Sequence, residues 1–316
     1  MKALYFNEFG TPDVLQYGSV PDPRITDTEL LVEMKFIGLN FADIYRRQGT
    51  YHIKKNTPYI DGYEGVGTII AAGINVTKFH VSETILFVDV PLANAQLVAV
   101  PENHGIKIPA SIDFKLAASI GLQGLTADFL AHDLGQNKPG DNVFIHGISG
   151  GVGQLLSQML TADGINVFGV TSTEEKQHLA IKQGAKKVFL RNSKWLKQYA
   201  GSFNTVYDGI GSTLNQSIQL LKHRGKVVFF GMAGGNPPAF NLIELLNQSK
   251  SILTGDLWDY LTSYSERKSR SQRLFGYFES QTITISAPTI FALSDGQEAH
   301  ELLESGRSTG KILLRP

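Results

Sequence analysis

Cysteine is absent from the 316-residue sequence. This absence excludes disulfide bonds, thiolate catalysis, iron–sulfur clusters and any zinc site that needs a cysteine ligand. An excess of charge of one sign is absent as well, because 29 lysines and arginines are balanced by 29 aspartates and glutamates. A formal net charge of zero gives the chain no general attraction to nucleic acid or to anionic lipid.

Long apolar runs are missing too. No stretch of 18 apolar residues occurs, so the sequence predicts no membrane-spanning helix. The first residues, MKALY, lead directly into strand-like sequence without the apolar core and small-residue cleavage site of a secretory signal. We therefore expect a cytoplasmic protein.

The chain is long enough for two domains, and its 32 glycines suit the many tight turns of a strand–helix fold. The first 115 residues are typical of short strands, with alternating or apolar runs at 29–38, 66–72 and 84–88. Frequent prolines between these runs favour connections in an antiparallel, partly barrel-like unit. One helix is expected at 41–48.

From about residue 113 the pattern changes to a regular alternation of helices and short apolar strands. The expected strands lie at 142–146, 166–171, 187–190, 205–210, 226–231 and 251–256. Six buried strands separated by helices predict a doubly wound parallel sheet that is covered on both faces.

After about residue 260 the sequence returns to the character of its first part. A polar helix is expected at 262–279, with strands at 282–286 and 311–314. The sequence thus predicts an α/β protein of two domains, a strand-rich one of residues 1–118 plus 261–316 and an inserted one of residues 119–260.

A glycine-rich loop separates the first strand of the inserted domain from the helix that follows it. The segment 147–153 reads GISGGVG, and its glycines allow a tight turn and close approach of the backbone to a ligand. The helix N-terminus offers N–H groups and the positive end of its dipole to an anion. We predict that Ser149, Gly150, Gly151 and Val152 bind a dinucleotide; the alternative is a set of purely structural glycine turns.

The end of the second strand of this domain indicates which dinucleotide is bound. An NAD site usually places a carboxylate there, whereas this chain has the hydroxyls of Ser172 and Thr173. Lys176 follows one helical turn later, and Arg191 at the end of the third strand could add a second positive charge. These groups could bind and neutralise a 2′-phosphate, which favours NADPH over NADH. The alternative for Lys176 is an ordinary exposed lysine.

Four segments resemble known signatures: 38–51 (GLNFADIYRRQGTY), 58–67 (PYIDGYEGVG), 146–153 (HGISGGVG) and 308–314 (STGKILL). Together they resemble the zinc-free quinone oxidoreductase, or zeta-crystallin-like, branch of the medium-chain dehydrogenase/reductase superfamily. The resemblance covers essentially the whole chain. It implies a GroES-like, strand-rich catalytic domain with an inserted Rossmann domain.

The resemblance also implies a reaction without a metal. Zinc alcohol dehydrogenases of the superfamily have a cysteine where this chain has Asn40 and a histidine where it has Tyr63. Asn and Tyr do not replace thiolate and imidazole as zinc ligands, and Glu64 alone makes no site. Hydride must then pass from NADPH to a small acceptor that is already electrophilic, such as a quinone or an α,β-unsaturated carbonyl.

By resemblance, the segment 40–51 carries the catalytic residues. Asn40 is expected to face the nicotinamide, and Tyr51 to polarise the substrate oxygen or to relay a proton. Asp43 would orient its neighbours, and Arg46 or Arg47 would pair with it.

Further positions are assigned by resemblance alone. Tyr45 belongs to the same catalytic stretch, although Tyr45 and Asp43 could instead be a packing residue and a helix cap. Thr126 would approach the nicotinamide amide, and the backbone at Gly231 would meet the nicotinamide ribose. Lys311 would complete the cofactor cleft.

Two other functions remain open. An enoyl-thioester or alkenal reductase of the same fold would depend more on Tyr51 as a proton donor. A catalytically silent NADPH-binding protein would bind the cofactor without turning over any acceptor. Relatives pair through an edge of the Rossmann sheet, so we expect a homodimer in which the segment 251–256 supplies the edge strand.

Overall fold

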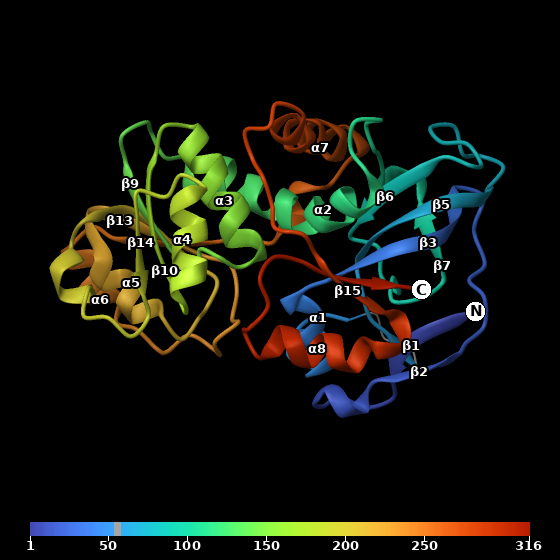
Figure 1. Cartoon of the computed structure of the whole chain (residues 1–316), viewed down its shortest axis with the longest axis horizontal. Helices are drawn as coiled ribbons and strands as arrows, with labels where there is room; N and C mark the ends of the chain where they lie inside the picture. The colour runs from blue at the N-terminus through green and yellow to red at the C-terminus, as the bar shows by residue number, and fades with distance from the viewer. Residues whose placement is uncertain (54–57) are drawn as a thin grey trace. The chain divides into compact units, whose positions relative to one another are not determined.

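The computed structural model describes residues 1–53 and 58–316, which form two compact units (Figure 1). One unit contains residues 1–122, 261–279 and 286–316, and the other contains residues 123–260 and 280–285. The first boundary falls inside helix α2 (Phe114–Phe129), a few residues after the one expected from the sequence.

The strand-rich unit contains two sheets. The larger has the strand order β15-β16-β3-β5-β6-β8, with β7 also paired to β3, and the smaller has the order β2-β1-β4. The strands are β1 (Lys2–Phe6), β2 (Gln16–Ser19), β3 (Glu29–Leu39), β4 (Tyr59–Ile60), β5 (Glu64–Ala72), β6 (Thr84–Val88), β7 (Leu97–Pro101), β8 (Gly105–Lys107), β15 (Thr289–Ala292) and β16 (Ile312–Arg315). This unit contains the first part of α2, up to Leu122, and the helices α1 (Phe41–Arg47), α7 (Tyr264–Glu279) and α8 (Gly296–Glu304).

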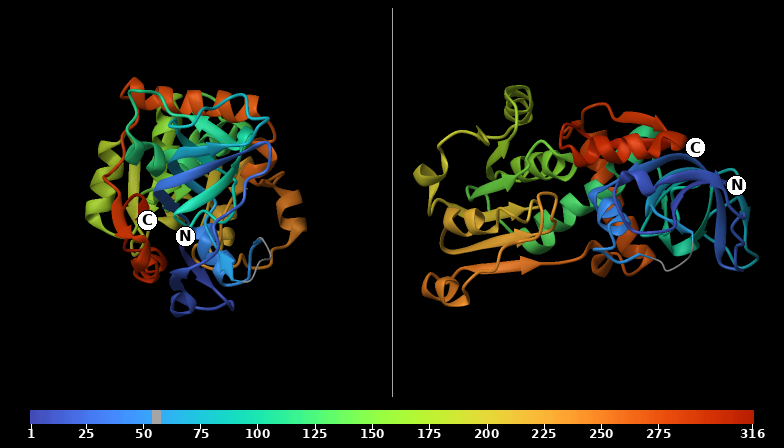
Figure 2. Two further views of the ribbon diagram at one scale, coloured as in Figure 1. Left: turned by 90° about the vertical axis from the view of Figure 1, so that its right-hand side faces the viewer. Right: turned by 90° about the horizontal axis from the view of Figure 1, so that it is seen from below.

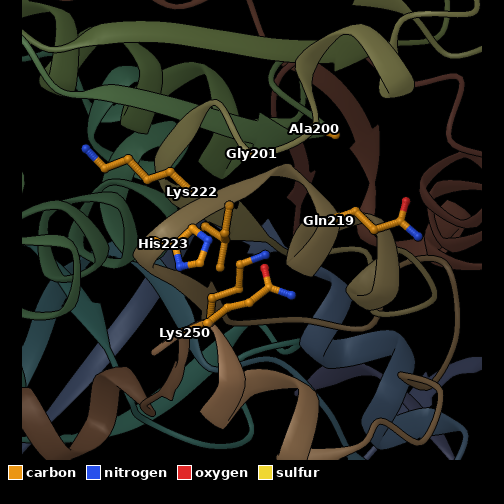
Figure 3. A pocket seen from close by; sticks show the side chains of 8 residues that line it. Ala200, Gly201, Gln219, Lys222, His223 and Lys250 are labelled. Carbon is orange, nitrogen blue, oxygen red and sulfur yellow. The ribbon is translucent and has the colours of Figure 1, made fainter.

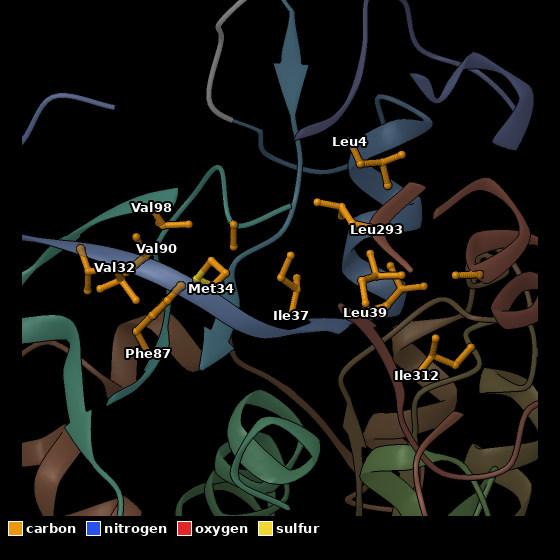
Figure 4. Packing of buried hydrophobic residues seen from close by; sticks show 14 of the residues in the cluster. Leu4, Val32, Met34, Ile37, Leu39, Phe87, Val90, Val98, Leu293 and Ile312 are labelled. Carbon is orange, nitrogen blue, oxygen red and sulfur yellow. The ribbon is translucent and has the colours of Figure 1, made fainter. Parts of the chain in front are cut away.

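Strand β3 shows why this part of the sequence forms an antiparallel sheet. Its alternate residues Leu30, Val32 and Met34 are buried, as the period of two in the sequence predicts. Figure 4 shows Val32 and Met34 in one apolar cluster with Phe87 of β6 and Val98 of β7. Burying each such side chain contributes roughly 1.5–3 kcal/mol. This core fixes β3, whose last residues lead into the candidate site.

The second unit is built on a six-stranded parallel sheet, seen in green to orange in Figures 1 and 2. Its strand order is β11-β10-β9-β12-β13-β14. The strands are β9 (Asn142–His146), β10 (Asn166–Thr171), β11 (Lys187–Leu190), β12 (Phe203–Asp208), β13 (Leu221–Phe229) and β14 (Ser251–Thr254). The helices between them are α3 (Gly151–Ala162), α4 (Glu174–Lys182), α5 (Leu214–Leu220) and α6 (Leu242–Asn247).

The strand order confirms the predicted doubly wound sheet. The chain proceeds outward from β9 through β10 to β11, and then returns to β12 on the other side of β9. Helices α3 and α4 pack on the first half of the sheet and α5 on the second half. In such a sheet, ligands bind at the carboxyl ends of the strands, where the order reverses.

The strand expected at 282–286 is wrong. The residues TITIS alternate like a strand, but the structure assigns none to them. Instead, the Thr284 N–H donates to the side-chain oxygen of Gln158 (3.0 Å), and the Gln158 amide donates to the Thr284 carbonyl (2.8 Å). A helix side chain has thus taken the place of a neighbouring strand, which holds residues 280–285 in the second unit. Strand β15 lies at 289–292, where none was expected.

Every helix within residues 1–53 and 58–316 is too short or too polar to cross a bilayer.

Candidate active site and cofactor-binding edge

Three residues from distant parts of the chain form a buried hydrogen-bonded group in the strand-rich unit. The Lys311 ammonium donates to the Asn40 side-chain oxygen (2.8 Å) and to Glu64 Oε1. The Asn40 amide donates to the same Glu64 oxygen at 2.8 Å. Their exposed fractions are 5%, 0% and 2% for Asn40, Glu64 and Lys311, so the charges face each other in a region without bulk water.

Backbone groups complete the environment of the Glu64 carboxylate. Its second oxygen accepts the N–H of Leu122 at 2.7 Å. Gly38 lies so close that a β-carbon in its place would collide with the carboxylate, and one at Gly121 would lie only 2.9 Å from it. Both positions therefore require glycine because the carboxylate packs directly on the backbone.

Asn40 also begins helix α1, which organises the next residues. The Asn40 N–H donates to Asp43 Oδ2 (2.8 Å), and Arg46 donates to Asp43 Oδ1 (2.9 Å). Burial raises the pKa of the Asp43 carboxyl, although Arg46 and the Asn40 N–H act in the opposite direction. Arg46 is thus the arginine that pairs with Asp43, whereas Arg47 forms an ion pair with Glu304.

The Arg46 guanidinium connects α1 to the expected catalytic tyrosine. Its Nε donates to the carbonyl of His52 (3.1 Å), and its central carbon lies 3.6 Å from the Tyr63 ring centroid. The same carbon is 5.3 Å from the centroid of Tyr51, whose ring lies 6.4 Å from that of Tyr45. The structure therefore brings the five predicted catalytic residues together within one unit.

Sequence reasoning missed two features of this region. It dismissed Glu64 as a lone carboxylate, and it assigned Lys311 only to the cofactor cleft, whereas the two form a buried ion pair. It also gave no role to Asp61, which is 1% exposed and whose Oδ1 accepts the Gly62 N–H at 2.7 Å. No local pattern could have found the Glu64–Lys311 pair, because its two residues are 247 positions apart, or the burial of Asp61, which depends on tertiary packing.

The glycine-rich loop of the second unit follows the carboxyl end of β9. Gly147 has a positive φ of 68°, and its carbonyl accepts the N–H of Gly150 at 2.9 Å. A β-carbon at Gly153 would collide with the Gly147 carbonyl, so loop and helix α3 can approach this closely only with glycine. The first N–H groups of α3, which have no partner within the helix, are left to point at the edge of the sheet.

Ser149 ties this loop to the neighbouring strand. Its hydroxyl lies 2.6 Å from that of Thr171, the last residue of β10. Ser149, Gly150, Gly151 and Val152 thus follow β9 at the same edge where Thr171 ends β10.

Two cations lie at the adjacent corner of the sheet. Burial and the nearby Arg191 both lower the pKa of Lys176. Thr173 caps helix α4, with its hydroxyl accepting the Lys176 N–H at 3.3 Å, and Ser172 beside it is exposed. Arg191 follows β11, where its N–H donates to the Thr171 carbonyl. Hydroxyls and two cations at one corner can bind a doubly charged anion.

Asp208 fixes the next strand end. Its carboxylate accepts the N–H groups of Ile210 (2.9 Å) and Gly211 (3.0 Å), and the hydroxyls of Thr213 and Ser217. Strand β12 consequently ends at Asp208 rather than at the expected residue 210.

Three more residues of interest lie in the second unit. Gly231 follows β13 and approaches the backbone of Gly209 so closely that a β-carbon would lie 3.0 Å from its carbonyl. Thr126 is half-buried on α2. Burial lowers the pKa of His146 to about 4, so this imidazole is neutral and packs edge-on against Phe144.

A cavity of about 540 Å³ lies at the opposite edge of the sheet, before β12, β13 and β14 (Figure 3). It is lined by Ala200, Gly201, Gln219, Leu221, Lys222, His223, Gln248 and Lys250. Because these residues lie before their strands or, for Leu221, Lys222 and His223, at the first residues of β13, the cavity is at the amino ends of the strands and is not the dinucleotide site.

Comparisons with known proteins agree with this geometry. Residues 26–110 match the family model of the alcohol dehydrogenase GroES-like domain, and residues 151–265 match that of zinc-binding dehydrogenases. A probable quinone oxidoreductase of Schizosaccharomyces pombe is 33% identical, over 96% of this chain and 94% of its own length. The 2-haloacrylate reductase of a Burkholderia species is 31% identical, over 99% and 98%.

A solved structure shows the same likeness in three dimensions. The crystal structure of Escherichia coli quinone oxidoreductase complexed with NADPH superposes with a TM-score of 0.95. Its sequence is 29% identical to this chain, and the match covers 100% of both chains.

The Glu64–Lys311 pair gives the first prediction. Glu64→Gln and Lys311→Met should each lower the free energy of unfolding by about 3–5 kcal/mol, because each leaves one buried charge without its partner. The double variant should lose less than the sum of the two, as measured by urea denaturation. Lys107→Met, at an exposed pair with Glu83, is the matched control and should change stability by less than about 1 kcal/mol. Additive losses at Glu64 and Lys311 would show that the two groups do not interact.

Proposed function

Because this chain belongs to the quinone oxidoreductase branch of the medium-chain dehydrogenase/reductase superfamily, we propose that it transfers hydride from NADPH, without zinc, to a quinone or an α,β-unsaturated carbonyl. The predicted family, the GroES-like plus Rossmann fold and the character of a quinone oxidoreductase-like enzyme are confirmed. The observation that carries the proposal is the buried Lys311–Glu64–Asn40 group.

The chemistry of this group supports a reaction without a metal. By resemblance, Asn40 and Tyr63 stand where zinc alcohol dehydrogenases have ligands. The Asn40 amide already donates to Glu64 and to the Gly38 carbonyl and accepts from Lys311. The Tyr63 ring lies under the Arg46 guanidinium. An amide engaged on both sides and a phenol ring covered by a cation are poor zinc ligands, so the acceptor must supply its own electrophilicity.

The carboxyl edge of the parallel sheet fits NADPH. The N-terminus of α3 with Ser149, Gly150, Gly151 and Val152 would hold the pyrophosphate. Ser172, Thr173, Lys176 and Arg191 would hold the 2′-phosphate, and Thr126, Gly231 and Lys311 would contact the nicotinamide half. When bound, the dihydronicotinamide supplies the hydride.

The residues around α1 would then manage the negative charge that arrives on the acceptor oxygen. Tyr51 would hydrogen-bond this oxygen and donate a proton to it. Arg46, held by Asp43 and by the His52 carbonyl, fixes the segment that carries Tyr51. Asn40 would face the nicotinamide, and Tyr45 would pack beside Tyr51.

A second candidate is reduction of an activated carbon–carbon double bond, as in an enoyl thioester or alkenal. The full-length likeness to a 2-haloacrylate reductase favours this alternative, because a haloacrylate is an α,β-unsaturated carboxylate. Hydride would be transferred by the same arrangement of residues, and Tyr51 would be the proton donor.

We also propose that the protein is a homodimer. Strand β14 is at the edge of the parallel sheet, where its outer backbone groups face no further strand in the described chain. Helix α6, just before it, exposes Leu242, Ile243 and Leu246 to 71%, 63% and 75%. A second copy that covers both would bury these apolar side chains and extend the sheet.

The main proposal is tested by cofactor oxidation with an ortho-quinone, a para-quinone, a short enone and an enoyl thioester. Quinone turnover with NADPH is expected, and Tyr51→Phe should lower kcat about a hundredfold, the usual scale of general acid catalysis. Tyr17→Phe, at an exposed tyrosine of β2, is the control. Turnover of only the enone or thioester would favour the second candidate. Binding of NADPH without any turnover would indicate a silent binding protein.

The cofactor preference gives a separate prediction. Lys176→Ala and Arg191→Ala should each raise the Kd for NADPH about tenfold, because each removes a charge-assisted hydrogen bond of the 2′-phosphate. The Kd for NADH should not change, because NADH lacks this phosphate. Fluorescence titration measures both, with Lys182→Ala at the end of α4 as the control. Equal effects on the two cofactors would remove these cations from the phosphate site.

The proposed dimer is tested by light scattering. The wild-type protein should have the mass of two chains, and Leu246→Glu should shift it toward one, because a charge would be buried in the interface. Ile74→Glu changes an even more exposed apolar residue of the other unit and should remain dimeric. A monomeric wild-type protein would contradict the proposal.

A further inference from the structure

Asp61 is a buried acid that forms no ion pair with a cation in residues 1–53 and 58–316. Only 1% of the residue is exposed, and its Oδ1 accepts the N–H of Gly62 at 2.7 Å. Its other oxygen, Oδ2, has no hydrogen-bond partner within residues 1–53 and 58–316. A buried carboxylate in this position would be left largely uncompensated.

The charges around Asp61 are already paired. Of the groups that face it from α1, Arg46 binds Asp43 at 2.9 Å and Arg47 binds Glu304 of α8. Further along the same region, Lys311 binds Glu64. Each of these three cations thus has another carboxylate as its partner, and Asp61 is a fourth acid.

The remaining neighbours do not supply a positive charge. Burial and Arg47 lower the pKa of His300, which contacts Arg47, to about 3, so it is neutral. Burial and the nearby Asp43 raise the pKa of Asp61 well above its usual range, against the opposing effects of Arg46 and the Gly62 N–H. The charge balance and the burial of Asp61 both favour its protonated form.

Two further polar groups near Asp61 have unused hydrogen-bonding atoms. The Asn94 amide has no partner for either atom within the described residues, and it packs so closely on Gly62 that a β-carbon there would collide with it. Arg46 Nη2 likewise has no acceptor in that part of the chain. The protonated Asp61 acid can donate a hydrogen bond to the Asn94 side-chain oxygen or to a bridging water, whereas the ionised carboxylate can accept one from the unused Arg46 Nη2.

We propose that Asp61 is a positioning residue: its neutral form leaves Arg46 on Asp43 and stacked on Tyr63, and its ionised form draws Arg46 toward itself. Arg46 also donates to the His52 carbonyl and lies 5.3 Å from the Tyr51 ring. Movement of Arg46 toward Asp61 would therefore displace the segment of Tyr51 and slow proton donation. The effect on catalysis rests on the role proposed for Tyr51, but the protonation of Asp61 does not.

The kinetic test compares the pH profiles of kcat and KM for the wild type, Asp61→Asn and Asp27→Asn. Asp27 is an exposed acid of the same unit and serves as the matched control. The wild-type kcat should fall at alkaline pH by up to about tenfold per pH unit beyond the pKa of Asp61, as its protonated fraction does. In Asp61→Asn, which cannot ionise, this fall should be removed while KM changes little. A profile of Asp61→Asn parallel to that of the wild type would overturn the positioning role.

A second measurement needs no substrate and separates this inference from the proposed function. At pH 7 the infrared difference spectrum of wild type minus Asp61→Asn should contain the C=O stretch of a protonated carboxylic acid, and the difference for Asp27→Asn should not. If Asp61→Asn fails to fold, Asp61→Ser gives the same comparison with a neutral hydroxyl. A carboxylate signal in place of the acid would overturn the inference.

The same protonation affects stability in a fixed direction. The pKa of Asp61 in the folded protein lies above the unfolded value of about 3.9. Proton binding by Asp61 therefore stabilises the folded state fully only below about pH 3.9, and this stabilisation is lost as the pH rises toward the folded pKa. The difference in Tm, Asp61→Asn minus wild type, should accordingly rise between pH 4 and pH 8. An unchanged difference across this range would contradict a buried neutral acid.

Discussion

The ion pair between Glu64 and Lys311 joins the beginning of β5 to the residue just before β16, across 247 positions of sequence. Burying two charges is costly, and here the cost is offset by their contact, by the backbone N–H of Leu122 and by the side-chain amide of Asn40, which also donate to the carboxylate. The pair in turn holds the Asn40 amide, and Asn40 begins the helix that carries Asp43 and Arg46. The geometry of the candidate catalytic residues therefore depends on one buried interaction.

Close approach of backbone to side chain or backbone is the second constraint. Gly38 allows the Glu64 carboxylate to lie against β3, and Gly153 allows helix α3 to lie against the glycine-rich loop. In both units the functional groups come from segments that could not be this close if a β-carbon were present. The glycines thus do more than permit turns; they set the distance at which charged groups and N–H donors are presented.

The proposed reaction follows from which groups occupy these positions. An ammonium, a carboxylate and an amide satisfy one another in the strand-rich unit, and one of them, Asn40, stands by resemblance where zinc alcohol dehydrogenases have a ligand. The proposed acceptor is one that is already electrophilic, as quinones and conjugated carbonyls are. On the parallel sheet, Arg191 lies near enough to lower the pKa of Lys176, and two cations at one corner suit the proposed site for a 2′-phosphate.

The sequence alone determined the alternating antiparallel strands, the alternation of helices with apolar strands that predicts a doubly wound sheet, and the glycine-rich loop, because these follow from local periodicity and from residues next to one another. It also determined which ligand types are missing, since no tertiary contact can supply a thiolate that the chain lacks. It misjudged 282–286, where the Gln158 side chain competes with strand pairing. Only the tertiary structure decided that Lys311 faces Glu64, that Arg46 rather than Arg47 faces Asp43, and that Asp61 has no ion-pair partner among the described residues. Ion pairing depends on which residues the sheet register brings together and on how far water is excluded, and neither can be read from residues far apart in the chain.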